Sequence, residues 1–284
     1  MTPTAPTAPA TVAQALAAAV ARGVDRLDAQ LLLLHALGRA PHDRAWLLAH
    51  DTDAIAGTAW ASLSAQLSRR LAGEPVAYLL GEKEFHGLRL RVDARVLVPR
   101  PDTETLVDWA LQCLQDREAP RVLDLGTGSG AIALALQHAR PDARVDAVDA
   151  SADALAVAMA NAQRLGLPVG FSQAHWLDGA PSGYAVIASN PPYIAAGDPH
   201  LPALQHEPVS ALVAGADGLD DIRQIVRDGP SHLAEGGWLL LEHGHDQAPA
   251  VRRLLEARGF AEVQSRVDLA GIQRCSGGVW RTVK

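Results

Sequence analysis

An Asn-Pro-Pro-Tyr tetrapeptide, residues 190–193, follows an apolar run and combines hydrogen-bond acceptors with a stiff backbone. The two prolines fix their own φ angles, bias the preceding residues toward extended backbone and offer no N–H groups. The tetrapeptide therefore presents two acceptors, the Asn190 side-chain oxygen and the Pro191 carbonyl, and a flat apolar ring at Tyr193. Two fixed acceptors suit a planar –NH2 group and leave its π face open to an electrophile. We predict a catalytic site for amide or amine nitrogen at Asn190, Pro191, Pro192 and Tyr193.

A glycine-rich segment lies upstream, between an apolar strand pattern and a helical pattern. Glycines let backbone approach a ligand closely, and the N–H groups at a helix N-terminus point toward it. A second strand pattern ends in Asp149, whose carboxylate could accept both hydroxyls of an adenosine ribose. Asp124, inside the first strand pattern, either contacts the ligand or only braces the loop. The cofactor contacts expected here are Gly126, Thr127, Gly128, Ser129, Gly130 and Asp149.

Together these segments resemble the class I S-adenosylmethionine-dependent methyltransferases that carry an Asn-Pro-Pro-Tyr loop after their fourth strand and act on planar nitrogens. Three further stretches are similar to the HemK/PrmC family, the release factor glutamine methyltransferases: residues 73–85, 98–104 and 241–244. The resemblance runs from about residue 70 to the end of the chain. It implies S-adenosylmethionine as methyl donor and transfer to the side-chain amide nitrogen, N5, of a glutamine in the Gly-Gly-Gln motif of peptide chain release factors.

Three more side chains are expected at the cofactor. Arg100 stands between two prolines that would aim it into the cofactor cleft, although a surface position in the linker is an equal alternative. Trp176 could pack against adenine or fill the core, and the resemblance favours the cofactor. Asn190 is counted among the cofactor contacts as well. His243-Gly-His245 lacks a third convergent ligand in the sequence, so we expect no metal.

Other functions remain open on the residues alone. Gly126-x-Gly128-x-x-Ala131 also fits the dinucleotide-binding fingerprint, so a nicotinamide-dependent oxidoreductase is a competitor, but it leaves residues 190–193 without a task. An N-methyltransferase acting on an exocyclic amine of DNA adenine or ribosomal RNA guanine would use the same loop on a flipped base. A non-catalytic binding module is disfavoured, because both halves of a transfer site are present.

Composition bears on the partners. The formal net charge of −7 has the wrong sign for a protein whose main task is to hold a phosphate backbone. The apolar stretches are too short to span a membrane, and the first ten residues lack the features of a signal peptide. We therefore expect a cytoplasmic protein with no membrane and no nucleic-acid substrate. We also expect a monomer, and the resemblance implies a release factor as its protein substrate.

The chain of 284 residues is long enough for two domains. We predict a disordered tail (1–10), a helical domain (11–83), a β-hairpin linker (84–102) and a further domain (103–284). The resemblance implies that the last is the S-adenosylmethionine-dependent methyltransferase domain and that the helical domain recognises the substrate, whereas a purely stabilising role is the alternative for the helical domain. Helical spacing in the second segment indicates helices over 12–20, 25–37, 43–49 and 53–72.

The last segment is predicted to be an α/β domain, a Rossmann-like, seven-stranded mixed sheet of the class I methyltransferase type. Its strands are expected near 121–125, 144–149, 169–173, 184–189, 237–242, 261–267 and 278–283, and its helices near 103–117, 130–139, 151–165, 219–234 and 246–258. The last two strands have no helix between them, which indicates a reversed final hairpin. Residues 194–218 form a long connection that is expected to order over the substrate.

Overall fold

The computed structural model describes residues 9–282. These residues form two compact units, one ending at Gly81 and one beginning at Glu82, and each unit has its own apolar core. Of the tail predicted over residues 1–10, residues 1–8 lie outside the described part of the chain. The Ala10 backbone is held by Gln14 and Ile55 through hydrogen bonds of 2.9 and 3.2 Å.

The N-terminal unit is helical, with α1 (Val12–Ala21), α2 (Arg26–Ala36), α3 (Arg44–Ala49), α4 (Gly57–Leu71) and α5 (Val76–Leu80). Apolar residues from these helices share one core, in which Leu32 and Leu63 are fully buried. α4 begins at Gly57 rather than at the predicted residue 53. The reason is that the carbonyls of residues 51 and 53 accept the first N–H groups of α1, which that helix cannot pair internally.

The second unit opens with an antiparallel hairpin of β1 (Glu82–Phe85) and β2 (Leu88–Arg91). Its turn residues, His86 and Gly87, have φ angles of 48° and 78°. A tight turn of this kind matches the twist of its strands. β2 ends at Arg91, earlier than the predicted hairpin segment does, because the Arg91 N–H and C=O groups bond to the Asn161 side chain at 2.8 and 3.0 Å instead of to another strand.

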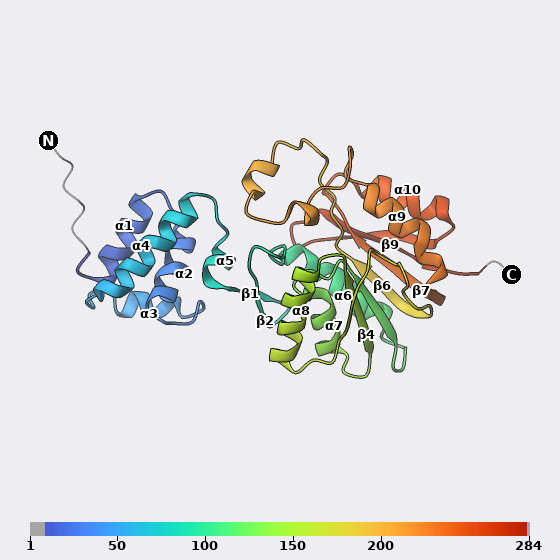
Figure 1. Ribbon diagram of the computed structural model, residues 1–284, viewed down its shortest axis with the longest axis horizontal. Coiled ribbons are helices and arrows are strands. Elements are labelled where there is room, and N and C mark those ends of the chain that lie inside the picture. Colours follow the sequence, from blue (N-terminus) through green and yellow to red (C-terminus); the bar gives the residue numbers. More distant parts are fainter. Residues whose placement is uncertain (1–8, 283–284) are drawn as a thin grey trace. The chain divides into compact units, whose positions relative to one another are not determined.

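A seven-stranded sheet organises the rest of this unit, with the strand order β5-β4-β3-β6-β7-β9-β8. Figure 1 labels four of its strands, β4, β6, β7 and β9. The strands are β3 (Arg121–Leu125), β4 (Arg144–Asp149), β5 (Gly170–Gln173), β6 (Tyr184–Ser189), β7 (Leu233–Glu242), β8 (Ala261–Val267) and β9 (Gln273–Trp280). β3 to β7 pair in parallel, whereas β9 runs antiparallel to both β7 and β8. The predicted α/β mixed sheet with a reversed final hairpin is confirmed.

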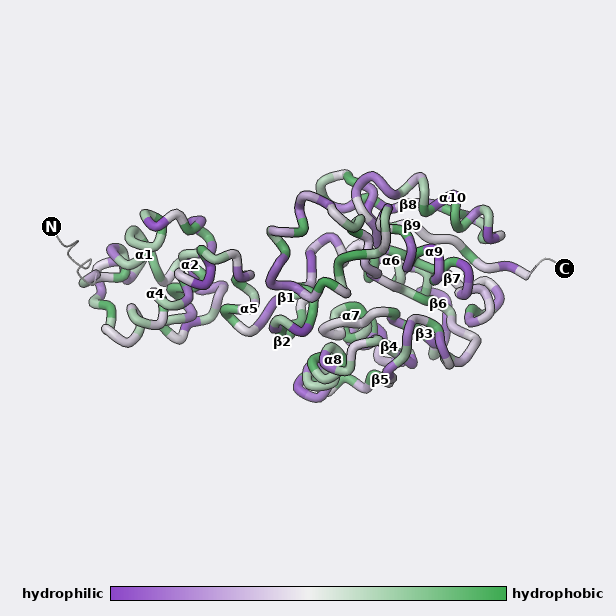
Figure 2. Tube along the Cα trace, turned by 45° about the horizontal axis from the view of Figure 1, so that its top comes forward, coloured by the Kyte–Doolittle hydropathy of each residue, from purple (hydrophilic) through white to green (hydrophobic). Residues whose placement is uncertain are grey.

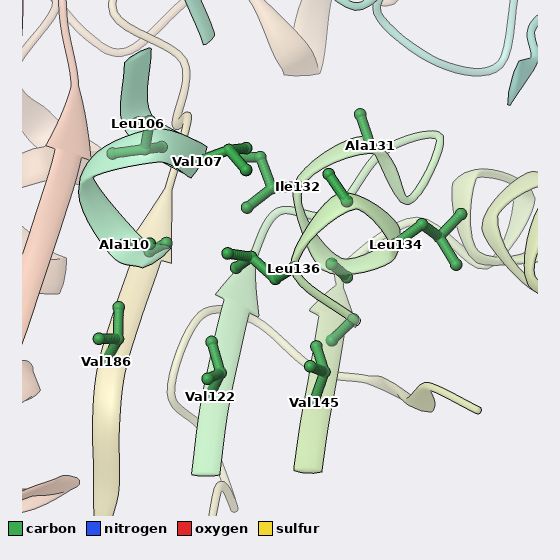
Figure 3. Packing of buried hydrophobic residues seen from close by; sticks show 14 of the residues in the cluster. Leu106, Val107, Ala110, Val122, Ala131, Ile132, Leu134, Leu136, Val145 and Val186 are labelled. Carbon is green, nitrogen blue, oxygen red and sulfur yellow. The ribbon is translucent and has the colours of Figure 1, made fainter. Parts of the chain in front are cut away.

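Helices cover both faces of the sheet. α6 (Glu104–Cys113), α7 (Ala131–Ala139) and α8 (Ala152–Leu165) share a core with Val122 of β3 and Val186 of β6, and Figure 3 shows side chains of α6 and α7 next to these strands. α9 (Asp220–Asp228) and α10 (Ala248–Arg258) share the other core with Leu123 and Ile187. Successive strand residues point to opposite faces, so β3 and β6 are apolar along most of their length.

Two boundaries near the C-terminus differ from the prediction. α9 ends at Asp228 rather than near residue 234, because Gly229 and Pro230 follow and proline lacks the N–H that a continuing helix needs. β9 begins at Gln273 rather than at residue 278. Gly277 and Gly278 lie inside this strand and weaken its sequence pattern, and a Cβ atom at Gly277 would stand 2.6 Å from the Leu239 carbonyl oxygen.

Hydropathy varies along the helices of both units, where apolar and polar residues alternate along the trace (Figure 2). This alternation is typical of helices that bury one face and expose the other. No helix within residues 9–282 is long and apolar enough to cross a membrane.

Candidate active site

The two sequence motifs meet at one edge of the sheet. β3 and β6 are parallel neighbours in which Leu125 pairs with Ser189, so the loops that follow them emerge side by side. The Ser189 hydroxyl donates to the Leu125 carbonyl oxygen at 2.8 Å and ties the two strand ends together. Open α/β sheets bind ligands at the carboxyl ends of their strands. The glycine loop and the acceptor loop, which we define as residues 190–193, therefore share a single site.

A cavity of about 320 Å³ lies at this edge, within the range of small-molecule sites. Eight of the predicted cofactor contacts and one further residue of the acceptor loop, Pro192, line its wall; the eight are Arg100, Gly126, Thr127, Gly128, Ser129, Asp149, Trp176 and Asn190. Gly130, Pro191 and Tyr193 are not among the lining residues. The structure thus brings together most, but not all, of the residues predicted for the site.

The glycine loop adopts backbone conformations that suit glycine. Gly126, Gly128 and Gly130 have φ angles of 69°, 55° and 85°, a region that other residues rarely enter. The space around a Cβ atom at Gly128 is open, so a ligand can approach the backbone there. Gly130 has a different role, because a Cβ atom on it would stand 2.9 Å from Leu134 and 3.3 Å from Ala158. It permits close packing of α7 against α8 rather than contact with the cavity.

Asp124 braces the glycine loop from within β3. Its Oδ2 atom accepts the Thr127 hydroxyl at 2.6 Å and the Ala133 N–H at 3.1 Å, which anchors both the loop and the start of α7. Burial raises the pKa of this carboxyl to about 7. Of the two interpretations left open by the sequence, the bracing one is confirmed by these contacts. Thr127 consequently turns its hydroxyl toward Asp124.

Asp149 is the last residue of β4 and faces the cavity while holding the backbone around it. Its Oδ2 atom accepts the Gly128 N–H and its Oδ1 atom accepts the Ser151 N–H, each at 2.9 Å. A carboxylate has about four acceptor positions, so these two bonds leave capacity for two hydroxyl groups. The residue can therefore both shape the loop and receive a ribose.

Trp176 lines the cavity beside the glycine loop. Its backbone φ angle of 50° is unusual for a bulky residue. The indole Nε1 donates to Asp221 Oδ1 at 3.2 Å, and the ring would lie 3.1 Å from a Cβ atom at Gly126. Burial raises the pKa of Asp221, which also lines the cavity. Asp221 was not predicted from the sequence, because an acidic residue in the first turn of a helix carries no signal beyond capping.

Asn190 presents its oxygen as a free acceptor. Its Nδ2 atom donates to the Thr103 hydroxyl oxygen at 3.2 Å, which leaves Oδ1 for another partner. Tyr193 differs from the prediction. Its ring packs against the core beneath α9 and α10, and its hydroxyl donates to Glu242 Oε1 at 3.4 Å, because a buried phenol needs an acceptor. The apolar face expected from Tyr193 is therefore not part of the cavity wall.

Arg100 reaches the cavity wall but does not point freely into it. Its guanidinium forms an ion pair with Glu207, a buried residue of the 194–218 connection. Glu207 Oε2 also accepts the Val98 N–H at 3.0 Å. A buried carboxylate requires such partners, so Arg100 lines the cavity while it pairs with Glu207. Pro208 and Ser210 beside it line the cavity.

His243 and His245, the two histidines weighed as metal ligands, lie in different environments. His243 is buried, with Nε2 2.7 Å from the Ser276 hydroxyl oxygen and Nδ1 2.9 Å from the Gly244 carbonyl oxygen. His245 is exposed. Within residues 9–282, no group of three or more histidine, cysteine, aspartate or glutamate side chains could hold a metal ion.

The cavity fits the adenosyl methyl donor that the sequence resemblance implied. Three features suit the sugar and base of a nucleoside that carries no phosphate group. They are the open backbone at Gly128, the Asp149 carboxylate at the end of β4 and the indole ring near Gly126. The free Asn190 oxygen stands on the same wall. The arrangement can hold an adenosyl group on one side and orient a planar nitrogen on the other.

Comparison with known proteins gives consistent results over both units. The family model of the methyltransferase small domain matches residues 103–263, and that of the PrmC N-terminal domain matches residues 9–81. The release factor glutamine methyltransferase of Bordetella pertussis is 52% identical over 263 residues, which cover 90% of this chain and 95% of that protein.

One further relative and one solved structure are also similar to this chain. The release factor glutamine methyltransferase of Burkholderia pseudomallei is 48% identical over 280 residues, 95% of this chain and 96% of that protein. The crystal structure of the release factor-specific protein-(glutamine-N5) methyltransferase from Alicyclobacillus acidocaldarius is 34% identical, with a TM-score of 0.41, and covers 65% of this chain and 95% of its own.

Proposed function

We propose that this protein transfers a methyl group from S-adenosylmethionine to N5 of a glutamine in a peptide chain release factor. The chain belongs to the family of release factor glutamine methyltransferases. The target we propose is the glutamine of the Gly-Gly-Gln motif. The observation that carries this function is the free Asn190 oxygen on the wall of a cavity that also contains Asp149 and the glycine loop.

The chain's own residues account for the binding of both reactants. Asp149 receives the ribose, the backbone at Gly128 approaches the donor, and Trp176 offers a ring to adenine. S-adenosylmethionine supplies an already activated, electrophilic methyl group. The protein's remaining task is to place a poorly nucleophilic amide nitrogen in line with it.

Asn190 and Pro191 perform that placement. The Asn190 Oδ1 atom and the Pro191 carbonyl each accept one N–H of the glutamine amide, and both bonds strengthen as the nitrogen loses its planarity. The amide proton becomes acidic only as the methyl group is transferred, so it leaves to water afterwards. No dedicated base is required by this mechanism.

We further propose that the N-terminal helical unit recognises the release factor, and that the protein acts in the cytoplasm as a monomer without a nucleic-acid substrate. One glutamine side chain has too little surface to be told apart from other glutamines, so selectivity must come from a protein contact outside the pocket. The family match to residues 9–81 supports a dedicated role for this unit.

The test offers the purified protein labelled S-adenosylmethionine with release factor, ribosomal RNA and duplex DNA in parallel. We expect label only on the release factor, and peptide mass mapping should locate it on the glutamine of the Gly-Gly-Gln motif. Label on RNA or DNA would favour a nucleic-acid methyltransferase, and a methyl group on another residue type would refute the proposed chemistry.

A further inference from the structure

A half-buried glutamine holds the C-terminal end of the acceptor loop. Gln247 directly precedes α10 and is not among the residues that line the cavity. Its Nε2 atom donates to the Tyr193 carbonyl oxygen at 3.0 Å and to the Asp217 carbonyl oxygen at 3.3 Å. The Gly218 carbonyl oxygen lies 3.5 Å from the same nitrogen. One amide group therefore joins the last residue of the acceptor loop to the end of the connection 194–218.

The acceptor loop can be held only from its two ends. Its two prolines carry no N–H, so the backbone between Asn190 and Tyr193 has no donor of its own. At the start of the loop, the Asn190 amide donates to the Thr103 hydroxyl oxygen at 3.2 Å. At the end, the Tyr193 carbonyl can only accept, and Gln247 supplies the hydrogen. Because proline backbone is stiff, fixing both ends also fixes the direction of the Pro191 carbonyl between them.

Backbone packs directly against backbone where the glutamine binds. A Cβ atom at Gly218 would stand 2.2 Å from the Tyr193 carbonyl oxygen, so the connection touches the acceptor loop without a side chain between them. The chain after the loop is paired with the connection as well, since the Ile194 N–H donates to the Leu212 carbonyl oxygen at 2.8 Å. Carbonyl oxygens cannot bond to one another, and an NH2 group with two hydrogens can join two of them.

The other end of this side chain has a separate task. Gln247 Oε1 accepts the Gly244 N–H at 2.8 Å, and the Gln247 backbone carbonyl accepts the N–H groups of Ala250 and Val251 at 2.9 and 3.0 Å. These bonds form the turn after β7 and the first turn of α10. The side-chain oxygen thus supports the local turn, whereas the NH2 group reaches the acceptor loop. A substitution that keeps the oxygen and removes the NH2 group separates stability from positioning.

We propose that Gln247 is a positioning residue that, through the Tyr193 carbonyl, holds the two substrate acceptors of the loop in the geometry for methyl transfer. This inference rests on the proposed function, in which the Asn190 oxygen and the Pro191 carbonyl accept the N–H groups of the glutamine amide. Misplacement of a reacting group by about 1 Å can cost on the order of 100-fold in rate. A small shift of the loop is therefore enough to slow the transfer while the donor still binds.

The variant Gln247→Glu keeps the acceptor for the Gly244 N–H and removes the donor, because an ionised carboxylate has no hydrogen to give. Its kcat on release factor should fall at least about tenfold. Its calorimetric affinity for S-adenosylmethionine should stay within about threefold of the native value. Gln264→Glu makes the same change at an exposed position on β8 and should keep native kcat.

Two results with Gln247→Glu would overturn the proposal. One is native kcat, which would show that the bond to the Tyr193 carbonyl does not matter for transfer. The other is a loss of S-adenosylmethionine affinity as large as the loss of kcat, because a general structural role would then account for both.

A double variant tests whether the effect passes through the acceptor loop. In Asn190→Ala the pair of acceptors is already broken, so adding Gln247→Glu should lower the single-turnover rate by less than about threefold. The same tenfold loss in both backgrounds would show that Gln247 acts elsewhere, and would overturn the proposal even if Gln247→Glu alone is slow.

These outcomes are distinct from a failure of the proposed function. If the native protein places no label on release factor, the function itself is wrong. If the native protein methylates release factor and Gln247→Glu does so at the same rate, the function stands and the positioning role is wrong.

Discussion

Asn190 offers one oxygen to the substrate, and its amide is already committed to Thr103 at 3.2 Å. A rigid acceptor is more valuable here than a charged one, because a misdirected or mobile oxygen would not hold the glutamine nitrogen in line with the methyl group. The neighbouring prolines serve the same end by removing backbone freedom and N–H groups.

Replacement of Asn190 by alanine should lower kcat by about 100-fold or more. The variant loses one of the two hydrogen bonds to the glutamine amide that strengthen in the transition state. Asn190→Asp should also fail, because its second oxygen cannot donate to the Thr103 hydroxyl oxygen as the Asn190 amide does, so the correct placement of the acceptor is lost. Single-turnover kinetics on release factor measure the effect, with S-adenosylmethionine affinity as the control. Near-native turnover in either variant would contradict the positioning mechanism.

Asp149 combines two tasks that the sequence could not separate. It was expected as a ribose acceptor, and the structure adds that it accepts the N–H groups of Gly128 and Ser151. Loss of the carboxylate therefore removes both a ligand contact and a support of the glycine loop.

For this reason Asp149→Ala should weaken S-adenosylmethionine binding by roughly 1 to 3 kcal/mol, the range for losing hydrogen bonds to a charged group. Asp153→Ala, an exposed position in the first turn of α8, is the matched control and should bind normally. Titration calorimetry decides the matter. Unchanged affinity, or tight binding of a nicotinamide dinucleotide by the native protein, would remove Asp149 from the cofactor site.

At the scale of elements, the connection 194–218 is fastened over the cavity at defined points. Glu207 bonds to the Val98 N–H and to Arg100, and Gln247 Nε2 donates to the carbonyl oxygens of Tyr193 and Asp217 at 3.0 and 3.3 Å. These contacts join the connection to the segment before α6 and to the acceptor loop. The cavity wall at Pro208 and Ser210 depends on them.

Glu207→Gln should loosen this wall, because an amide NH2 group would replace one of the two carboxylate oxygens that accept from Val98 and Arg100. S-adenosylmethionine affinity should weaken about tenfold, or about 1.4 kcal/mol, and limited proteolysis within residues 194–218 should become faster. Turnover at saturating donor should change little, since the acceptor loop is untouched. A variant that resists proteolysis and binds S-adenosylmethionine as well as the native protein does would show that Glu207 does not anchor the connection.

At the scale of the whole molecule, the chain divides into two units that have separate cores. The described residues of the cavity and of the acceptor loop all lie in the unit that begins at Glu82. Binding of the methyl donor and selection of the protein substrate are therefore expected to be separable properties.

A protein comprising residues 82–284 should bind S-adenosylmethionine with native affinity but lose most of its kcat/KM on folded release factor. We choose Glu82 as the start because β1 pairs with β2, so a later start would leave β2 without its partner. Calorimetry and kinetics on folded factor measure the two properties. Full activity of the shortened protein would refute a recognition role for the helical unit.

The sequence by itself determined the class of the fold and the place of the site. Strand and helix periods, the three glycines and the Asn-Pro-Pro-Tyr loop are local signals, because each depends on backbone conformations that a few neighbouring residues dictate. The family resemblance read from these motifs is confirmed by relatives at 48 and 52% identity. The boundaries of α4 and β9 did not follow from the sequence, because contacts with distant segments decide them. The carbonyls before α4 bond to α1, and Gly277 inside β9 packs closely against Leu239.

Only the tertiary structure decided what each side chain does. Tyr193 turns from the cavity to Glu242, Arg100 pairs with Glu207, and Gly130 serves helix packing. The partners in these contacts are distant in sequence, and none of them follows from local pattern. Buried carboxylates draw nearby donors toward themselves because an unpaired one is costly in the protein interior. The site is therefore located by its motifs but oriented by acidic residues that the fold brings up behind them.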